Sequence, residues 1–117
     1  MILAAVDDLL FSSKIRTTAR LAGVDLVFAR TPEDILSQTR ALKPELIIFD
    51  LNAAKTDPIN TVTSLRRDPE LQDVRTMGFV AHVDNELIVA ARQAGVDEVM
   101  ARSAFAANLV KILTHAR

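Results

Sequence analysis

The chain has no cysteine, tryptophan or tyrosine, and only three glycines among its 117 residues. The lack of cysteine excludes a disulfide scaffold, thiol catalysis and thiolate metal sites, and it is typical of a reducing compartment. Long hydrophobic runs are missing too, because the apolar start at 1–6 stops at Asp7 and Asp8. We therefore expect a soluble, cytoplasmic protein with no signal peptide and no membrane contact.

The chain also lacks an excess of charge of one sign. Fourteen Lys and Arg against fifteen Asp and Glu give a net charge of −1, which argues against nucleic acid as a partner. Half of the residues are hydrophobic and a quarter are charged, a balance that excludes a disordered chain. This length is enough for one packed core, so we expect a single domain over residues 1–117.

Short apolar runs alternate with longer amphipathic stretches along the whole sequence. The runs predict five strands, at 2–6, 24–28, 46–49, 75–80 and 98–101. The stretches between them carry apolar residues at helical spacing. Strands that alternate with helices favour right-handed crossovers and a parallel sheet covered on both faces. The sequence therefore predicts an α/β fold, a flavodoxin-like doubly wound (βα)5 unit with a five-stranded parallel sheet in the order 2-1-3-4-5.

Helix ends are marked by capping residues. Thr31-Pro32 and Asp57-Pro58 each combine an N-cap residue with a proline at the first helical position, so two helices should begin there. Gly23 and Gly95 stand where a left-handed residue ends a helix, so two helices should end there.

Acidic residues follow two of the predicted central strands. Asp7 and Asp8 come directly after the first strand, and Asp50 ends the third. Because those strands are neighbours in the order 2-1-3-4-5, the three carboxylates should converge at one edge of the sheet. Their mutual repulsion calls for a proton or a hard cation such as Mg²⁺. The alternative is that they are solvated loop residues or helix caps, and Asp8 could cap a helix that begins near Leu9.

This layout resembles the receiver domain of bacterial two-component response regulators, over residues 1–117. The resemblance rests on Val6-Asp7-Asp8 and on Leu46 to Asn52 within five βα units. It implies that Asp50 is the phospho-acceptor and that Mg²⁺ is held by Asp8, by Asp7 through water, by Asp50 and by the backbone carbonyl of Asn52. It also implies phosphorelay signalling with a histidine kinase as partner, output by protein contact without an output domain, and no enzymatic activity beyond self-phosphorylation.

Other positions depart from the receiver pattern. Ala81 stands where the family has a hydroxyl that bonds the phosphoryl group, and Arg102-Ser103 replaces the Lys-Pro pair. Arginine is a planar fork that pairs readily with carboxylates, so we expect Arg102 to bridge Asp50 or the acid pair in the resting protein. These departures indicate an atypical receiver, or pseudo-receiver, and leave open a phosphorylation-independent dimerisation or scaffold role.

Two enzyme or cofactor classes are less consistent with the sequence. A haloacid-dehalogenase-type phosphohydrolase also uses an aspartate nucleophile and Mg²⁺, but it expects Asp-x-Asp where this chain has Asp50-Leu51-Asn52. A flavin- or nucleotide-binding domain of the flavodoxin type expects a phosphate loop rich in Gly, Ser and Thr after the first strand. Here Asp7 and Asp8 would repel a phosphate.

The last two helices are nearly uncharged on more than one face. The stretch 87–91 is apolar throughout, and the last helix should turn Phe105, Leu109 and Ile112 to the sheet and leave Ala106, Val110 and Leu113 on an adjoining side. We predict a homodimer or a bound partner on the surface formed by the fourth helix, the fifth strand and the fifth helix.

Overall fold

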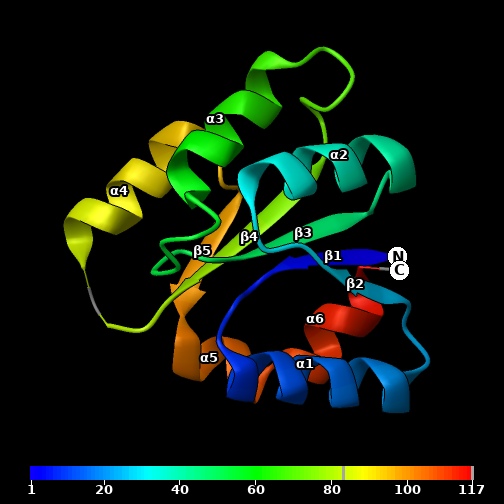
Figure 1. The fold of residues 1–117 in the computed structure, drawn as a ribbon. Helices are drawn as coiled ribbons and strands as arrows, with labels where there is room; N and C mark the ends of the chain where they lie inside the picture. The colour runs from blue at the N-terminus through cyan, green and yellow to red at the C-terminus, as the bar shows by residue number, and fades with distance from the viewer. Residues whose placement is uncertain (83, 117) are drawn as a thin grey trace.

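A computed structural model describes residues 1–82 and 84–116 and confirms the predicted fold (Figure 1). Five parallel strands form one sheet in the order β2-β1-β3-β4-β5. The strands are β1 (Ile2–Ala5), β2 (Leu26–Phe28), β3 (Leu46–Asp50), β4 (Arg75–Val80) and β5 (Glu98–Ala101). The helices are α1 (Leu9–Ala22), α2 (Pro32–Leu42), α3 (Pro58–Arg67), α4 (Asn85–Ala94), α5 (Arg102–Ala107) and α6 (Leu109–His115).

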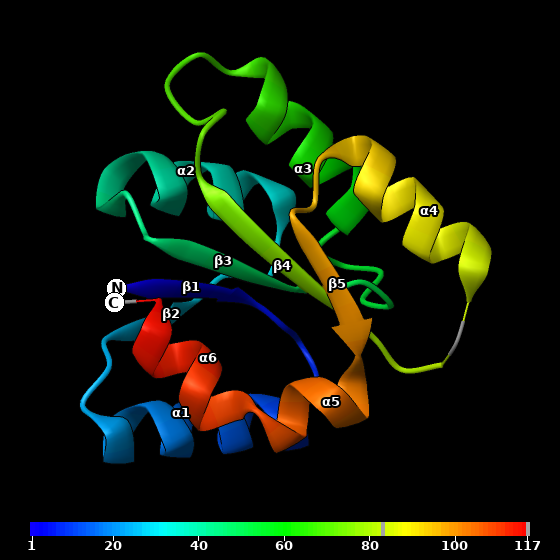
Figure 2. The same ribbon diagram turned by 180° about the vertical axis from the view of Figure 1, so that it is seen from behind.

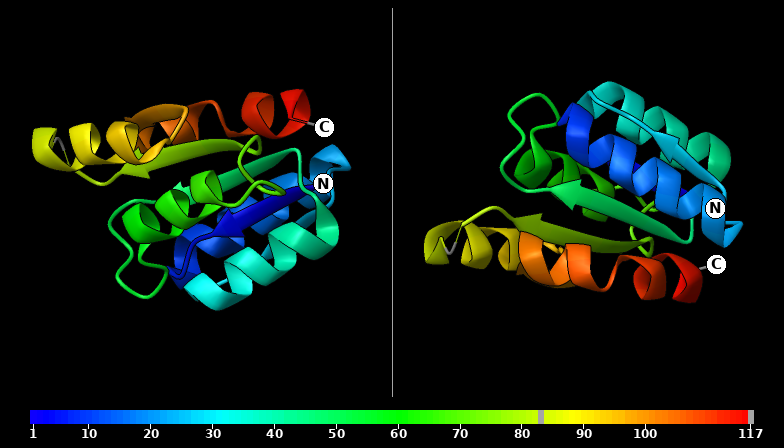
Figure 3. Two further views of the ribbon diagram at one scale, coloured as in Figure 1. Left: turned by 90° about the horizontal axis from the view of Figure 1, so that it is seen from above. Right: turned by 90° about the horizontal axis from the view of Figure 1, so that it is seen from below.

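Helices cover both faces of the sheet, which explains why the central strands read as continuous apolar runs. Helices α1, α5 and α6 lie on one face and α2, α3 and α4 on the other (Figures 2 and 3). Alternate residues of β1 and β3 enter two separate cores. Ile2, Ala4 and Val6 pack with Ile15 and Phe105 on the first face. On the second face, another core is built from Leu3, Ala5, Ile35, Ile47, Phe49, Val62 and Leu65.

The fifth helix is divided in two, which corrects the expectation of one continuous helix. Asn108 separates α5 from α6, and its backbone (φ −109°, ψ 15°) leaves the helical region. The break changes the face that α6 turns inward. Leu113 is therefore fully buried, whereas Ile112 is only partly buried, the reverse of the prediction. None of the described helices is long and apolar enough to cross a membrane.

The helix ends follow the capping signals with one exception. Thr31 caps α2 through its side chain, and Gly23 and Gly95 end α1 and α4 in the left-handed conformation. α3 begins at Pro58 as predicted, but Asp57 has a positive φ of 43° and its carboxylate accepts from the Asn60 side chain instead of from a helix N–H. Asp57 therefore shapes the loop before α3 and does not cap the helix.

One close backbone contact positions the loop after β3. A Cβ on Gly78 would lie 2.7 Å from Cδ1 of Leu51, so the lack of a side chain at Gly78 lets the Leu51 side chain pack against β4 in its present position. The Leu51 backbone N–H also donates to the carbonyl of Phe79 at 3.0 Å. Because these contacts fix the chain directly after Asp50, they place the start of the loop that carries Asn52.

Candidate functional site

The strand ends bring the predicted acidic residues to one corner of the molecule. Asp50 is the last residue of β3, and Asp7 and Asp8 follow β1, its neighbour in the sheet. Arg102 begins α5 directly after β5. The charges of Asp7, Asp8 and Arg102 all act on the Asp50 carboxylate. All four side chains therefore contribute to one electrostatic environment, which we call the acid corner.

The Asp8 carboxylate has both oxygens engaged. Oδ1 accepts the backbone N–H of Phe11 at 2.9 Å and so caps α1, as a side chain in the N-cap position does. Oδ2 accepts from the Arg102 guanidinium at 3.0 Å. The Phe11 N–H and then Arg102 hold the pKa of Asp8 below its ordinary value. Asp8 is thus an ionised helix cap that also closes an ion pair across the corner.

An aromatic ring fixes the position of the Arg102 guanidinium. Its central carbon lies 4.5 Å from the centre of the Phe11 ring. Phe11 in turn contacts Phe79 edge to face at 5.1 Å between ring centres, and Phe105 at 5.8 Å. A guanidinium over a ring face gains both electrostatic attraction and dispersion. Arg102 therefore rests on the aromatic core while it faces Asp8.

Asp50 is the most enclosed of the acids. Only 8% of its surface is exposed, and one carboxylate oxygen accepts the backbone N–H of Asn52 at 3.0 Å. Burial raises the pKa of Asp50 above its ordinary value, although the Asn52 N–H and the charge of Arg102 oppose the rise. Asp7 and Asp8 add a smaller increase to the pKa through like-charge repulsion. The corner therefore holds a carboxyl group whose ionisation is costly.

Asn52 connects two loops at the edge of this corner. Its side-chain oxygen accepts the backbone N–H of Ala81 at 2.8 Å, so the loop after β3 is tied to the loop after β4. Position 81 lacks a hydroxyl, and its backbone N–H is already engaged by Asn52. The sequence predicted Asn52 only as a metal ligand through its backbone carbonyl. Its side chain has the further role of linking the two loops.

A hollow of about 490 Å³ opens beside the guanidinium. Its walls come from Phe11, from the ends of β4 and β5 and from the first residues of α5. The space is open because several of the lining side chains are small. The lining residues are Phe11, Val80, Ala81, His82, Ala101, Arg102, Ser103 and Ala106. Arg102 therefore lines this hollow in addition to pairing with Asp8.

The acid corner, as arranged, does not fit a divalent cation. Within residues 1–82 and 84–116, no group of three acidic or histidine side chains has the arrangement of a metal site. Asp8, the expected direct ligand, is engaged by Arg102 and by Phe11. Hard cations such as Mg²⁺ need oxygen ligands with accessible lone pairs. A metal could use Asp8 Oδ2 fully only after Arg102 had moved.

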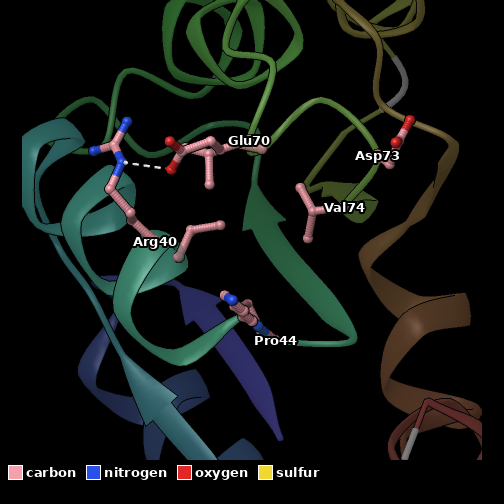
Figure 4. Close-up of a pocket in the computed structure, with 8 residues that line it drawn as sticks. Arg40, Pro44, Glu70, Asp73 and Val74 are labelled. Atoms are coloured by element: carbon pink, nitrogen blue, oxygen red, sulfur yellow. Dashed lines mark ion pairs between the residues drawn. The ribbon is translucent and has the colours of Figure 1, made fainter.

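A second cavity lies far from these residues. About 440 Å³ in volume, it opens between the end of α2 and the segment that leads to β4, at the sheet edge where the strands begin (Figure 4). Both signs of charge line it: Arg40 Nε lies 3.8 Å from Glu70 Oε2, and Asp73 lies on the other side of the cavity from this pair (Figure 4). Arg40 also pairs with Asp68. This charge-balanced groove contains none of the predicted site residues.

Two residues of the corner have roles that the sequence did not predict. Phe11 was not among the predicted site residues, and the side chain of Asn52 had no expected contact. Phe11 stands at helical spacing from Ile15, which is typical of a buried helix face, but no local pattern pairs it with a residue of α5. The expected bridge from Arg102 to an acid is present, with Asp8 as the partner.

No protein-family model matches the chain, and no curated protein is similar to it in sequence. Solved structures with the same fold are numerous. A response regulator from Hahella chejuensis superimposes with a TM-score of 0.85 at 18% identity, covering 98% of this chain and 92% of that one. The chemotaxis response regulator CheY4 of Vibrio cholerae gives a TM-score of 0.82 at 16% identity, covering 99% and 97%.

A third similar structure contains a metal ion. The Mn²⁺-bound form of response regulator Rcp1 gives a TM-score of 0.76 at 18% identity, covering 97% of this chain and 88% of that one. The three superpositions cover 97–99% of this chain and so include its five-stranded sheet. The chain therefore has the fold of the response regulator receiver domain.

Proposed function

We propose that this protein is a receiver-like signalling protein in which Asp50 is the phospho-acceptor and the output is contact with another protein. The observation that carries the proposal is the position of Asp50. It ends β3 at the carboxyl edge of a doubly wound sheet, where such folds bind their ligands. The charges of two further acids and one guanidinium also act on it.

The proposed reaction transfers a phosphoryl group to Asp50 from a phosphohistidine of a kinase or from a small acyl phosphate. A carboxylate oxygen of Asp50 forms a bond to phosphorus while the donor's bond to phosphorus breaks, and the electron pair leaves with the donor. Arg102 would offset charge on the transferring oxygens. The expected Mg²⁺ at Asp7, Asp8, Asp50 and the Asn52 carbonyl does not fit while Arg102 holds Asp8, so no step is assigned to it.

Amide chemical shifts provide the test. The protein would be titrated with Mg²⁺ and then with beryllofluoride or acetyl phosphate, with Asp50→Asn as the control. We expect a second set of shifts after the phosphate analogue, near residues 50–52 and 81, in the wild type alone. Shifts confined to the Mg²⁺ step, with no step that depends on Asp50, would refute the acceptor role.

A second candidate is a pseudo-receiver that binds its partner without phosphorylation. It is favoured by the resting Asp8–Arg102 ion pair and by Ala81, which has no hydroxyl for a phosphoryl oxygen. In that case the acid corner would be a structural feature, and removal of the Asp50 charge would leave partner binding unchanged.

For the contact surface we propose the face formed by α4, β5 and the helices α5 and α6. Val89 of α4 is 50% exposed and Val110 of α6 is 59% exposed, while Val99 and Met100 of β5 are only partly buried. Exposed apolar residues around an edge strand are typical of an interface. The proposed occupant is a second copy of this chain or a signalling partner such as the kinase.

Sedimentation velocity at high protein concentration tests the homodimer. We expect a concentration-dependent dimer that Val89→Glu and Val110→Glu each weaken. Leu21→Glu changes a leucine of α1 that is 81% exposed and lies outside this surface, so it is the matched control. A wild type that stays monomeric would exclude the homodimer, and equal weakening by all three variants would exclude this surface.

A further inference from the structure

We propose that Arg102 and a divalent cation compete for Asp8, so that the guanidinium acts as a built-in gate on metal entry to the acid corner. The inference rests on the proposed function only in treating Asp50 as the acceptor beside that corner. The competition itself follows from the contacts of Asp8, and it applies whether or not Asp50 is phosphorylated.

The competition arises because both oxygens of Asp8 are already engaged. Oδ1 accepts the backbone N–H of Phe11 at the start of α1, so a ligand on this oxygen would weaken the cap of that helix. Oδ2 accepts from Arg102 at 3.0 Å. A cation that binds Oδ2 would lie beside the guanidinium and be repelled by its like charge, so the two are expected to exclude each other.

The Arg102 guanidinium and a divalent cation both supply positive charge to the same acid group. Asp7, Asp8 and Asp50 place three acidic groups in a partly desolvated corner, where their repulsion is relieved by a positive charge. Among the ion pairs of the described residues, Arg102 is the partner of this acid group. If the guanidinium is removed, the acids keep their repulsion and lose their cation, which favours binding of a hard dication.

The displaced guanidinium would need space beside Asp8, and the structure contains a hollow next to Arg102. Phe11 supports Arg102 from one side at 4.5 Å. The hollow of about 490 Å³ lies beside it, lined by the small residues Ala81, Ser103 and Ala106. We expect Arg102 to turn toward this hollow when a cation binds Asp8, as a two-position gate requires.

Metal titration of arginine variants tests the gate. Mn²⁺ would be followed by paramagnetic broadening of amide signals, and Mg²⁺ by chemical shifts, in the wild type, Arg102→Gln and Arg102→Lys. We expect Arg102→Gln to bind both ions roughly ten times more tightly than the wild type, with broadening at residues 7, 8, 50 and 52. Arg102→Lys, which keeps the charge but loses the fork and the ring contact, should lie between them.

Two controls make the result specific. Arg92→Gln removes an exposed arginine from the last turn of α4 and should bind like the wild type. Adding Asp8→Asn to Arg102→Gln should abolish the gain. Thermal unfolding checks that each variant is folded. If Arg102→Gln does not fold, the comparison of Arg102→Lys with the wild type tests the gate.

Equal affinity in the wild type and both Arg102 variants would overturn the gate, as would broadening centred outside the acid corner. These outcomes are independent of phosphoryl transfer, which is read from the Asp50-dependent shifts with a phosphate analogue. The tenfold difference in metal affinity can be present in a protein that accepts no phosphoryl group. It can also be missing from a protein that does accept one.

Discussion

Replacement of Phe11 by leucine tests whether the aromatic core holds the guanidinium of the acid corner. Phe11 is 9% exposed and lies below Arg102, with Phe79 and Phe105 as its aromatic neighbours. Leucine keeps an apolar side chain at this position but removes the ring face and the ring edge. The substitution should therefore weaken folding and release Arg102 without emptying the core.

The magnitude follows from three contacts. A guanidinium over a ring at a partly exposed site contributes about 0.5–1 kcal/mol. Each aromatic pair adds about 0.5–1.5 kcal/mol beyond burial of its area. We expect Phe11→Leu to lower the free energy of unfolding by about 2–3 kcal/mol, since such contacts are not fully additive. Domains of this size are stable by about 5–15 kcal/mol, so the variant should remain folded.

A double-mutant cycle isolates the arginine contact. The chain has no tryptophan or tyrosine, so urea unfolding is best followed by far-ultraviolet circular dichroism. Phe11→Leu and Arg102→Gln should show a coupling energy of about 0.5–1 kcal/mol. Phe49→Leu, in the core on the other face of the sheet, should be additive with Arg102→Gln. A coupling energy indistinguishable from zero for Phe11 and Arg102, or an equal one for Phe49 and Arg102, would show that the Phe11 ring does not hold the guanidinium.

Three further substitutions have distinct expected outcomes. Gly78→Ala forces a Cβ to within 2.7 Å of the Leu51 side chain, so it should cost about 1–3 kcal/mol in urea unfolding, and a neutral result would show that Leu51 can move freely. Arg66→Met removes donors to the backbone carbonyls of Gly95, Gln72 and Val74, so it should cost about 3 kcal/mol, and a loss below about 1 kcal/mol would contradict that network. Asp50→Asn should be more stable than the wild type at neutral pH. The raised pKa of Asp50 means that the folded state holds the proton more tightly, so wild-type stability falls as pH rises from the ordinary aspartate value through the folded one. The advantage should fade below the ordinary value, and a difference in melting temperature that is constant with pH would contradict it.

The fold could be predicted because its signals are local. Strands buried on both faces read as apolar runs such as the one at 46–49, and residues such as Thr31 and Gly23 marked helix ends through their own backbone preferences. The helix break at Asn108 was not predicted because no proline or glycine stands at this point of the sequence. The consequence was a wrong inward face for the last part of the chain, where Leu113 is buried in place of Ile112.

The acid corner could be predicted in part. Asp7, Asp8 and Asp50 end neighbouring strands, so topology alone places them together. An ion pair for Arg102 was expected from the chemistry of a guanidinium near carboxylates, but its partner was open between Asp50 and the acid pair. The choice of Asp8 depends on the ring of Phe11, which supports the guanidinium from a helix distant in sequence. Contacts of this kind depend on packing and leave no spacing pattern.

The central claim, that Asp50 accepts a phosphoryl group, is tested most directly by intact-protein mass spectrometry after incubation with acetyl phosphate and Mg²⁺. We expect a single phosphoryl adduct on the wild type, located by fragmentation to Asp50, and none on Asp50→Asn. An unmodified wild type, or an equal adduct on Asp50→Asn, would contradict it.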